Sequence, residues 1–351
     1  MRPLFRTLFV VGAVGAFLPF ATGCSASDND TKSDDSSGDS SQSCLSGKTI
    51  DFVVPYSTGG GYDLRARSIA KPLGTVLDAT VVVRNEEGAG GLLAANKTSV
   101  AKPDGTRIQI VNSLGALSAD LAGAEGTAYS SEKFTWLARI SDEPDVLVSR
   151  KSGSPQDLDE LKAAKNARMV AIGAGSNTYI DALVVSEIVG LTRQVIVGFG
   201  GAPEVLTSLL RGEADLFASS FSSLESQIKS GDVNLIATFG TERIDSMSDV
   251  PTLAELPGLN DDQKLLLSAH GALIATGRAI IAPPDMPKAT TECLRNALET
   301  VLTDDKFMAE MAAQDRPIGF MAGKDLSDLV SKNMRETPER YRGILEESYA
   351  N

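Results

Sequence analysis

Short apolar runs alternate with helix-type patterns along most of this chain. The segment TIDFVVP (Thr49–Pro55) is β-branched and apolar, which predicts a buried strand, and a glycine-rich turn and a helical pattern follow it. The same order of strand, turn and helix recurs with the strand TVVVRN, and a third strand, TRIQIVN, follows a turn at Pro103, Asp104 and Gly105. Strands that alternate with helices predict an α/β fold with a mostly parallel sheet and right-handed crossovers.

The pattern restarts after PDVLVSRKSG, a predicted strand that leaves the first set of elements. ARMVAIGAG, QVIVGFGG and ADLFASS then predict strands, separated by helices over 179–189 and 202–211. We interpret the strand RAIIAPP and the helices from Lys288 onwards as a return to the first set. The chain is therefore predicted to form two lobes with a hinge and a cleft. Lobe 1 is predicted over 47–145 and 276–351, and lobe 2 over 146–275.

The N-terminus has the pattern of an export signal. Arg2 and Arg6 precede an apolar run from Leu8 to Phe20, which is too short to span a membrane comfortably. The small residues Ala21, Thr22 and Gly23 then precede Cys24, an arrangement that resembles a bacterial lipobox. We expect residues 1–23 to be removed and Cys24 to carry a lipid that anchors the exported protein to the outer face of the cytoplasmic membrane. The alternative is an ordinary cleaved signal with an incidental Cys.

The next segment, from Ser25 to Ser43, consists almost entirely of Ser, Asp, Asn, Thr and Gly. Such a segment buries too little apolar surface to offset its chain entropy. Residues 24–46 are therefore predicted to be a lipidated Cys followed by a disordered tether. Beyond them remain roughly 305 residues, a length that suits two lobes better than one core.

The charge of the chain excludes one class of partner, and its cysteines predict a disulfide. The net charge of -13 argues against nucleic acid as a partner, because phosphate binding needs clustered Lys and Arg. An anionic ligand would have to be held by local dipoles against this overall field. If Cys24 is lipidated, Cys44 and Cys293 are the remaining thiols, and an exported chain with two such Cys is expected to form a disulfide.

Three glycine-rich loops carry the candidate chemistry. Gly59–Gly61 let backbone amides approach a ligand, and Tyr62 and Asp63 then open a helix. Gly88–Gly91 and Gly173–Asn177 repeat this arrangement before later helices. Several helix N-termini directed at one cleft would form an anion site. For a single loop, tight turns and helix caps are the alternative explanation.

Catalytic and cofactor signals are weak. SGKT at 46–49 lacks the earlier Gly of a P-loop, and the glycine clusters lack dinucleotide-binding spacing. A single His, His270, leaves no room for a His-based metal site or a Ser-His-Asp triad, and we expect it to be a surface or packed residue. The protein is therefore expected to need no metal or cofactor and not to be an enzyme.

The loops also carry a family resemblance. VPYSTGGGYDLRARSIA with VVVRNEEGAGGLLAANKTSVAKPDGTRI, and later FGGAPEVLTSLLRGEADL with SQIKSGDVNLIATFGTERIDSMSDVPTLAELPG, resemble the tripartite tricarboxylate transporter receptors, or Bug family. The resemblance implies a type II periplasmic-binding-protein fold whose lobes close on a ligand. It also implies a partner permease with a large and a small membrane subunit.

The resemblance assigns ligand contacts by position. Those in lobe 1 are Tyr56, Ser57, Thr58, Gly59, Gly60, Gly61 and Asp63, with Gly88, Ala89, Gly90 and Gly91 opposite, and those in lobe 2 are Ser176, Asn177, Thr178, Phe199, Gly200, Gly201, Ser219 and Ser220. Two residues depart from the family pattern. The family commonly has an aromatic residue and Gly in its returning strand, whereas TGRAII places Arg278 nearby, and Tyr179 stands near the position of a usual His.

Together these patterns predict a monomeric extracytoplasmic receptor that captures a small carboxylate and delivers it to the permease. The ligand could be a dicarboxylate or tricarboxylate, an acidic amino acid or an aromatic acid. A ligand-sensing receptor for a signalling partner is the first alternative. An exported α/β enzyme is the second, although it lacks a recognisable acid-base pair, nucleophile or metal set.

Overall fold

The computed structural model of the protein describes residues 44–142, 144–153, 155–192, 194–244 and 247–349. The predicted signal peptide, Cys24 and the tether up to residue 43 lie outside these ranges. The strands are β1 (Thr49–Val54), β2 (Thr80–Asn85), β3 (Arg107–Asn112), β4 (Thr135–Ser141), β5 (Asp145–Arg150), β6 (Met169–Val170), β7 (Leu216–Ser220), β8 (Val233–Thr238), β9 (Arg278–Ala282) and β10 (Met321–Ala322).

Helices connect most of these strands. The α-helices are α1 (Gly61–Leu77), α2 (Leu92–Ser99), α3 (Ser113–Leu121), α4 (Leu158–Ala163), α5 (Asn177–Val189), α6 (Ala202–Leu210), α7 (Phe221–Ser230), α8 (Asp261–Ile274), α9 (Lys288–Leu302), α10 (Asp305–Ala312), α11 (Gly323–Glu336) and α12 (Glu339–Tyr349). Short 3₁₀ turns occur at η1 (Ala89–Gly91), η2 (Ser131–Lys133) and η4 (Leu253–Glu255). Across the part of the chain that the structure describes, no helix is long and apolar enough to cross a membrane.

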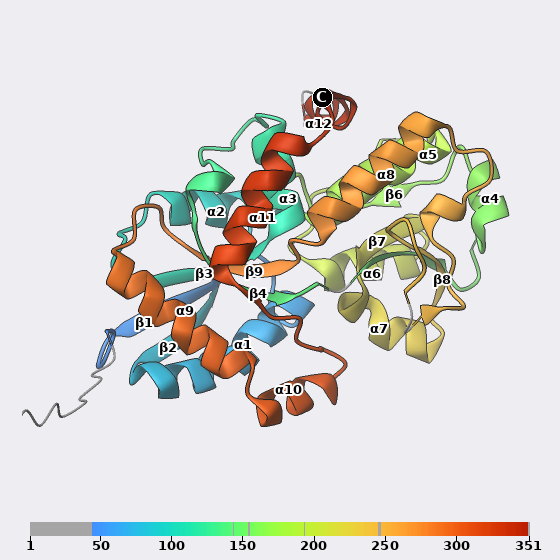
Figure 1. Cartoon of the computed structure of the whole chain (residues 1–351). Helices are drawn as coiled ribbons and strands as arrows, with labels where there is room; N and C mark the ends of the chain where they lie inside the picture. The colour runs from blue at the N-terminus through green and yellow to red at the C-terminus, as the bar shows by residue number, and fades with distance from the viewer. Residues whose placement is uncertain (1–43, 143, 154, 193, 245–246, 350–351) are drawn as a thin grey trace, which may run out of the picture. The chain divides into compact units, whose positions relative to one another are not determined.

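The strands form one sheet in each lobe (Figure 1). The lobe 1 sheet has the order β10-β4-β9-β3-β1-β2, in which β1 runs parallel to β2 and β3. However, β9 runs antiparallel to both β3 and β4, and β10 runs antiparallel to β4. The prediction of a mostly parallel sheet is therefore wrong. Because β9 re-enters lobe 1 from lobe 2, it is inserted between β3 and β4 in the opposite direction instead of following a right-handed crossover.

The lobe 2 sheet has the order β6-β7-β5-β8 and is also mixed. β6 is parallel to β7, whereas β5 is antiparallel to β7 and β8. The strand predicted at QVIVGFGG is absent from this described region, where Ile196 makes only an isolated bridge to Val170. Ile196 and Val197 are exposed, so this segment gains little from burial. The neighbouring strand β6 has only two residues and offers few backbone groups for pairing.

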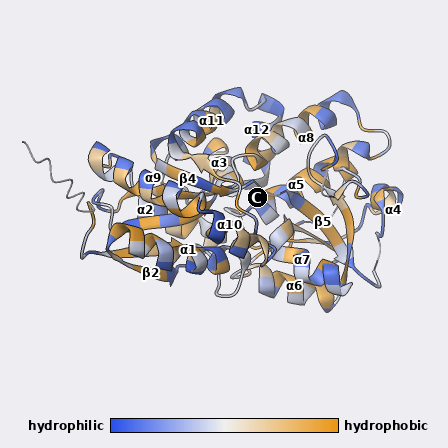
Figure 2. Ribbon diagram, turned by 60° about the horizontal axis from the view of Figure 1, so that its bottom comes forward, coloured by the Kyte–Doolittle hydropathy of each residue, from blue (hydrophilic) through white to orange (hydrophobic). Residues whose placement is uncertain are grey.

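Each sheet has helices on both faces, with its apolar strands inside (Figure 2). In β3, Ile108 and Ile110 pack with α1 and α9, while Val111 packs with α2, α3 and α11. In β7, Phe217 packs with α6 and α7, while Leu216 packs with α5 and α8. This alternation places two helical layers around each sheet, because successive side chains of a strand point to opposite faces.

Two connections join the lobes, from β4 to β5 and from α8 to β9. They lie next to each other, since Ser141 at the end of β4 pairs with Arg278 at the start of β9. Two adjacent connections of this kind form a hinge about which the lobes can rotate.

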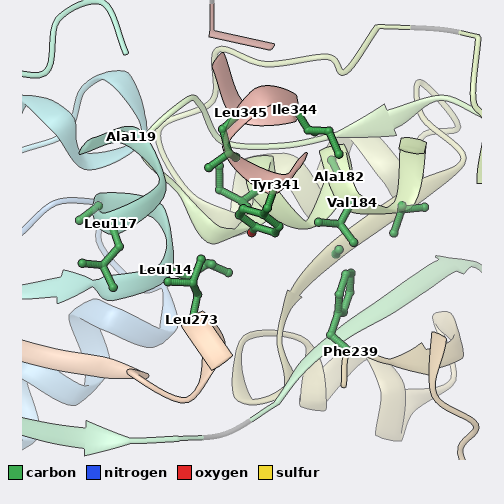
Figure 3. Packing of buried hydrophobic residues seen from close by; sticks show 14 of the residues in the cluster. Leu114, Leu117, Ala119, Ala182, Val184, Phe239, Leu273, Tyr341, Ile344 and Leu345 are labelled. Carbon is green, nitrogen blue, oxygen red and sulfur yellow. The ribbon is translucent and has the colours of Figure 1, made fainter. Parts of the chain in front are cut away.

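The last helix, α12, contacts helices of both lobes. It packs against α3 of lobe 1 and against α5 and α8 of lobe 2. Figure 3 shows apolar side chains of α3, α5 and α12 gathered around Tyr341, and the same hydrophobic cluster contains Leu114, Ile344 and Leu345. Residues 276–351 were assigned to lobe 1 from the sequence, but these contacts make α12 a bridge between the lobes.

A disulfide joins the start of the domain to α9. Cys44 and Cys293 are bonded, with a Cα–Cα distance of 6.4 Å and a sequence separation of 249 residues. The bond holds the segment that precedes β1 against the helix layer of lobe 1.

Candidate functional site between the lobes

The glycine-rich turns of the two lobes face and touch each other. The Ser57 N–H, in the turn after β1, donates to the Gly200 carbonyl of lobe 2 over 3.0 Å. The Gly175 N–H, in the loop before α5, donates to the Ala89 carbonyl of lobe 1 over 3.2 Å. The predicted loops are thus brought together at one crevice between the lobes, which we call the interlobe crevice.

Two close approaches in the interlobe crevice require glycine. A Cβ added to Gly115, in the first turn of α3, would lie 2.2 Å from the Gly175 carbonyl oxygen. A Cβ added to Gly90 would lie 2.4 Å from the Gly173 carbonyl oxygen, and Gly90 has a φ of +66°. Both contacts are with backbone, which cannot yield as a flexible side chain can. They mark a closed arrangement of the lobes.

The space left within the interlobe crevice is small. One cavity, of about 20 Å³, is lined by residues that include Tyr62, Asp145, Ser220 and Arg278. A second, of about 10 Å³, is lined by residues that include Tyr56 and Gln109, and Asn112 lines both cavities. Each has room for roughly one water molecule. A small organic acid therefore needs the lobes to separate before it can enter.

Arg278 forms one wall of the larger cavity. Its side chain is buried, and its two terminal nitrogens each donate to a serine hydroxyl of α7, Ser222 and Ser223, over 3.0 Å. Its guanidinium carbon lies 4.4 Å from the ring centre of Tyr62, a cation–π distance. From the sequence, Arg278 was a departure from the family pattern and was not among the predicted ligand contacts. The available signal was a charged residue at the start of an apolar strand.

Two tyrosines of the first turn pack together beside Arg278. The rings of Tyr56 and Tyr62 lie 4.8 Å apart in an edge-on arrangement, and Asn112 donates to the Tyr62 hydroxyl over 2.5 Å. Burial raises the pKa of Tyr62 to about 12, although the charge of Arg278 acts in the opposite direction. Burial also raises the pKa of Tyr56, so both hydroxyls keep their protons at neutral pH.

Asp63 organises the turn that follows β1. Its carboxylate accepts hydrogen bonds from the Gly59 N–H, Arg67 and Asn85 over 2.9–3.0 Å. Burial by itself raises the pKa of Asp63, but these hydrogen bonds hold it below its ordinary value. We therefore regard Asp63 as a positioning residue that fixes the Gly59–Gly61 turn.

The predicted residues of α5 act largely within lobe 2. The Ser176 hydroxyl caps α5 by accepting from the Tyr179 N–H, and the Thr178 hydroxyl accepts from the Ile172 N–H. Asn177 donates to Asp145 over 3.0 Å and to Ser220 over 3.3 Å. Asn177 thus links two residues that line the larger cavity.

The remaining predicted residues lie at different depths. Thr58, Gly59 and Ala89 are exposed at the rim, whereas Gly201 is buried against the Ser57 side chain. Phe199 packs against the hydrophobic cluster beneath α6, and Ser219 is buried within β7. Ser57, Gly60, Gly61, Gly88, Gly91 and Gly200 belong to the loops that meet across the crevice.

A buried polar network lies behind the larger cavity. The two ring nitrogens of His270 lie 2.9 Å from Asp181 Oδ1 and 2.9 Å from the Tyr341 hydroxyl. Burial lowers the pKa of His270 to about 4, so its imidazole is neutral at pH 7. Burial raises the pKa of Asp145, and repulsion by Asp181 adds to this shift. The network joins β5, α5, α8 and α12, and His270 is a packed residue as expected.

Comparison with known proteins identifies the family of this chain. Residues 65–346 match the family model described as the tripartite tricarboxylate transporter family receptor. The chain belongs to this family. It is 31% identical over 274 residues to a UPF0065 protein encoded in the TAR-I ttuE-ttuC′ intergenic region of Agrobacterium vitis, and the match covers 75% of this chain and 74% of that relative.

Solved structures support the fold of this family receptor. The periplasmic binding protein BugD superimposes with a TM-score of 0.71 at 22% identity, covering 86% of this chain and 97% of its own. MatC from Rhodopseudomonas palustris, solved with bound malate, superimposes with a TM-score of 0.70 at 24% identity, covering 85% and 99%. The predicted α/β fold with two lobes and an interlobe cleft is confirmed. Among the described residues, no group of three or more His, Cys, Asp or Glu is arranged to hold a metal ion.

Proposed function

We propose that this receptor captures a small carboxylate in the interlobe crevice and delivers it to a membrane permease with a large and a small subunit. Family membership across residues 65–346 carries the proposal. The structural neighbour MatC, which has bound malate, supports a carboxylate as the ligand class. We propose no catalytic activity for the chain.

The residues of the interlobe crevice support this ligand class. The N-termini of α1 and α3 in lobe 1, and of α5, α6 and α7 in lobe 2, follow the loops that meet there. Helix N-termini present free N–H groups and partial positive charge, both of which stabilise an anion. Their convergence compensates locally for the net charge of -13.

We propose that the lobes capture the ligand by opening and closing about the hinge. Opening would break the Ser57–Gly200 and Gly175–Ala89 contacts and expose the turns of lobe 1 to a carboxylate. Closure would then add the contacts of lobe 2. Because a ligand shifts such an equilibrium only by its preference for one state, binding must be tighter in the closed form than in the open form.

A thermal-shift screen of small organic acids tests the proposed function. An acid that binds the folded receptor should raise its melting temperature in proportion to the logarithm of its concentration, by mass action. The matching neutral amides serve as controls and should have no effect. A screen in which no di-, tri- or monocarboxylate raises the melting temperature contradicts the proposal.

The lipid anchor at Cys24 is part of the same proposal. Anchoring would keep the receptor close to its permease, with residues 25–46 as the tether. Membrane fractionation of cells that express the wild type or Cys24→Ser tests this. The variant should move to the soluble fraction, and an unchanged membrane fraction would count against lipidation.

A further inference from the structure

The two small cavities of the interlobe crevice have different chemistry. Arg278 supplies a positive charge to the larger one, whereas Tyr56 and Gln109 supply neutral hydrogen-bond donors to the smaller one. Asn112 lines both, so the cavities adjoin the same side chain. Separation of the lobes would open both ends to one ligand.

The Arg278 end suits a carboxylate. Arg278 is 2% exposed, and its guanidinium is held by Ser222, Ser223 and the ring of Tyr62. A carboxylate accepts from a guanidinium more strongly than a neutral hydroxyl does, and it can do so with two oxygens at once. A ligand carboxylate can therefore replace the serine hydroxyls when the lobes separate.

The smaller cavity presents two hydrogen-bond donors. No described residue bonds to the Tyr56 hydroxyl or to the Gln109 side-chain nitrogen, although both atoms are buried. The orientation of the Gln109 amide is fixed, because its oxygen accepts from the Thr98 hydroxyl over 2.6 Å. Thr98 in turn accepts from Arg107 over 2.9 Å. A buried donor without an acceptor is costly, which favours a ligand oxygen at this position.

Asp145 lines the larger cavity and would repel a carboxylate if it were ionised. Burial first, and the neighbouring Asp181 second, raise the pKa of Asp145 well above its ordinary value. The raised pKa favours the protonated form of Asp145, which would not repel a ligand carboxylate at the Arg278 end.

We propose that Arg278 binds one carboxylate of the ligand while Tyr56 and Gln109 bind a second acceptor group, so that this receptor selects diacids over monoacids. This inference rests on the proposed function and assigns its specificity to three residues. Arg278 would require a carboxylate on the ligand, and Tyr56 and Gln109 would require a second polar group on it.

The test compares matched acids by isothermal titration calorimetry. The probes are succinate, glutarate and adipate, together with the monoacids butyrate, valerate and hexanoate of the same chain lengths. The wild type should bind at least one diacid about tenfold or more tightly than its matched monoacid, because the monoacid leaves two buried donors without an acceptor.

Variants separate the two ends. Arg278→Gln should weaken diacid binding about 100-fold, and Arg278→Lys should restore part of it, because the charge remains but the two-point contact is lost. Tyr56→Phe and Gln109→Leu should each weaken the diacid about fivefold and leave the monoacid unchanged. Tyr341→Phe is the matched control, since Tyr341 lines neither cavity and its hydroxyl already has a partner in His270 Nδ1 at 2.9 Å.

The outcomes distinguish this inference from the proposed function. If the wild type binds none of the six acids but the thermal-shift screen finds another carboxylate ligand, the inference is overturned while the function stands. If neither experiment finds a carboxylate that binds, the proposed function fails and the inference fails with it. If the wild type binds diacids and monoacids equally, or if folded Arg278→Gln binds as the wild type does, the inference is overturned while the function stands. Should Arg278→Gln not fold, equal losses of diacid and monoacid in Tyr56→Phe and Gln109→Leu would also overturn it.

Discussion

Replacing both Cys44 and Cys293 by Ser is expected to lower the free energy of unfolding by about 4 kcal/mol. The disulfide closes a loop with a sequence separation of 249 residues, and a long loop removes much entropy from the unfolded chain. Urea or guanidinium denaturation of the oxidised wild type and the double variant measures the difference.

Reduction supplies the control for this prediction. The wild type in reductant should unfold at the same denaturant concentration as the double variant, and the variant itself should not respond to reductant. Equal midpoints for the oxidised wild type and the variant would contradict the prediction.

Acidification from pH 6.5 to pH 4 is expected to remove about 3 kcal/mol of stability through His270. The pKa of His270 is about 4 in the folded protein and 6.5 in an unfolded chain. Between these values the unfolded state binds a proton that the folded state does not, so stability is full above pH 6.5 and is lost as the pH falls towards 4. Urea unfolding at several pH values measures this loss.

His270→Gln isolates the contribution of the imidazole. The raised pKa values of Asp145 and Asp181 act in the opposite direction, because the folded state then holds protons that the unfolded state releases. These carboxyls are present in both proteins, and their contributions largely cancel in the comparison. The stability advantage of the wild type over the variant should shrink as the pH falls. Parallel pH curves for the two proteins would contradict the assignment.

The sequence predicted the strands whose β-branched, apolar pattern lies next to a turn signal. TVVVRN coincides with β2, and TRIQIVN contains β3. The order of strands was not predictable in the same way, because the insertion of β9 between β3 and β4 depends on where the chain returns from lobe 2. β4 (Thr135–Ser141) was missed, since its partners β9 and β10 lie far along the chain.

The site was predictable where backbone geometry defines it. Runs of glycine before helices are local signals, and the turns they predicted meet across the crevice. Arg278, Gln109 and Asp145 were missed because their roles depend on contacts between distant segments. Arg278 can be recognised as a cavity wall only in the folded chain, where Ser222 and Ser223 of α7 lie next to it. In the sequence these serines are 55 to 56 residues away. Gln109 lies within an apolar strand, where the residue alone indicates no ligand.

His270 shows the same limit. From the sequence it was a lone histidine expected on the surface or in a packed position. Its partners Asp181 and Tyr341 are 89 and 71 residues away, and only the folded chain brings the three together.

Hydrogen–deuterium exchange of Gly115→Ala tests most directly whether the two lobes meet and separate at the facing glycine turns. The added methyl would lie 2.2 Å from the Gly175 carbonyl oxygen, so the closed contact should be lost while α3 itself tolerates Ala. Gly343→Ala, on α12, is the matched control, because nothing lies within 4 Å of a Cβ at that position.

We expect exchange about tenfold or more faster in Gly115→Ala than in the wild type for peptides over 56–62 and 171–178, which carry the Ser57 and Gly175 N–H groups. Peptides of α9, far from the crevice, should exchange as in the wild type, and Gly343→Ala should match the wild type throughout. Unchanged exchange in both crevice peptides of Gly115→Ala would contradict the account.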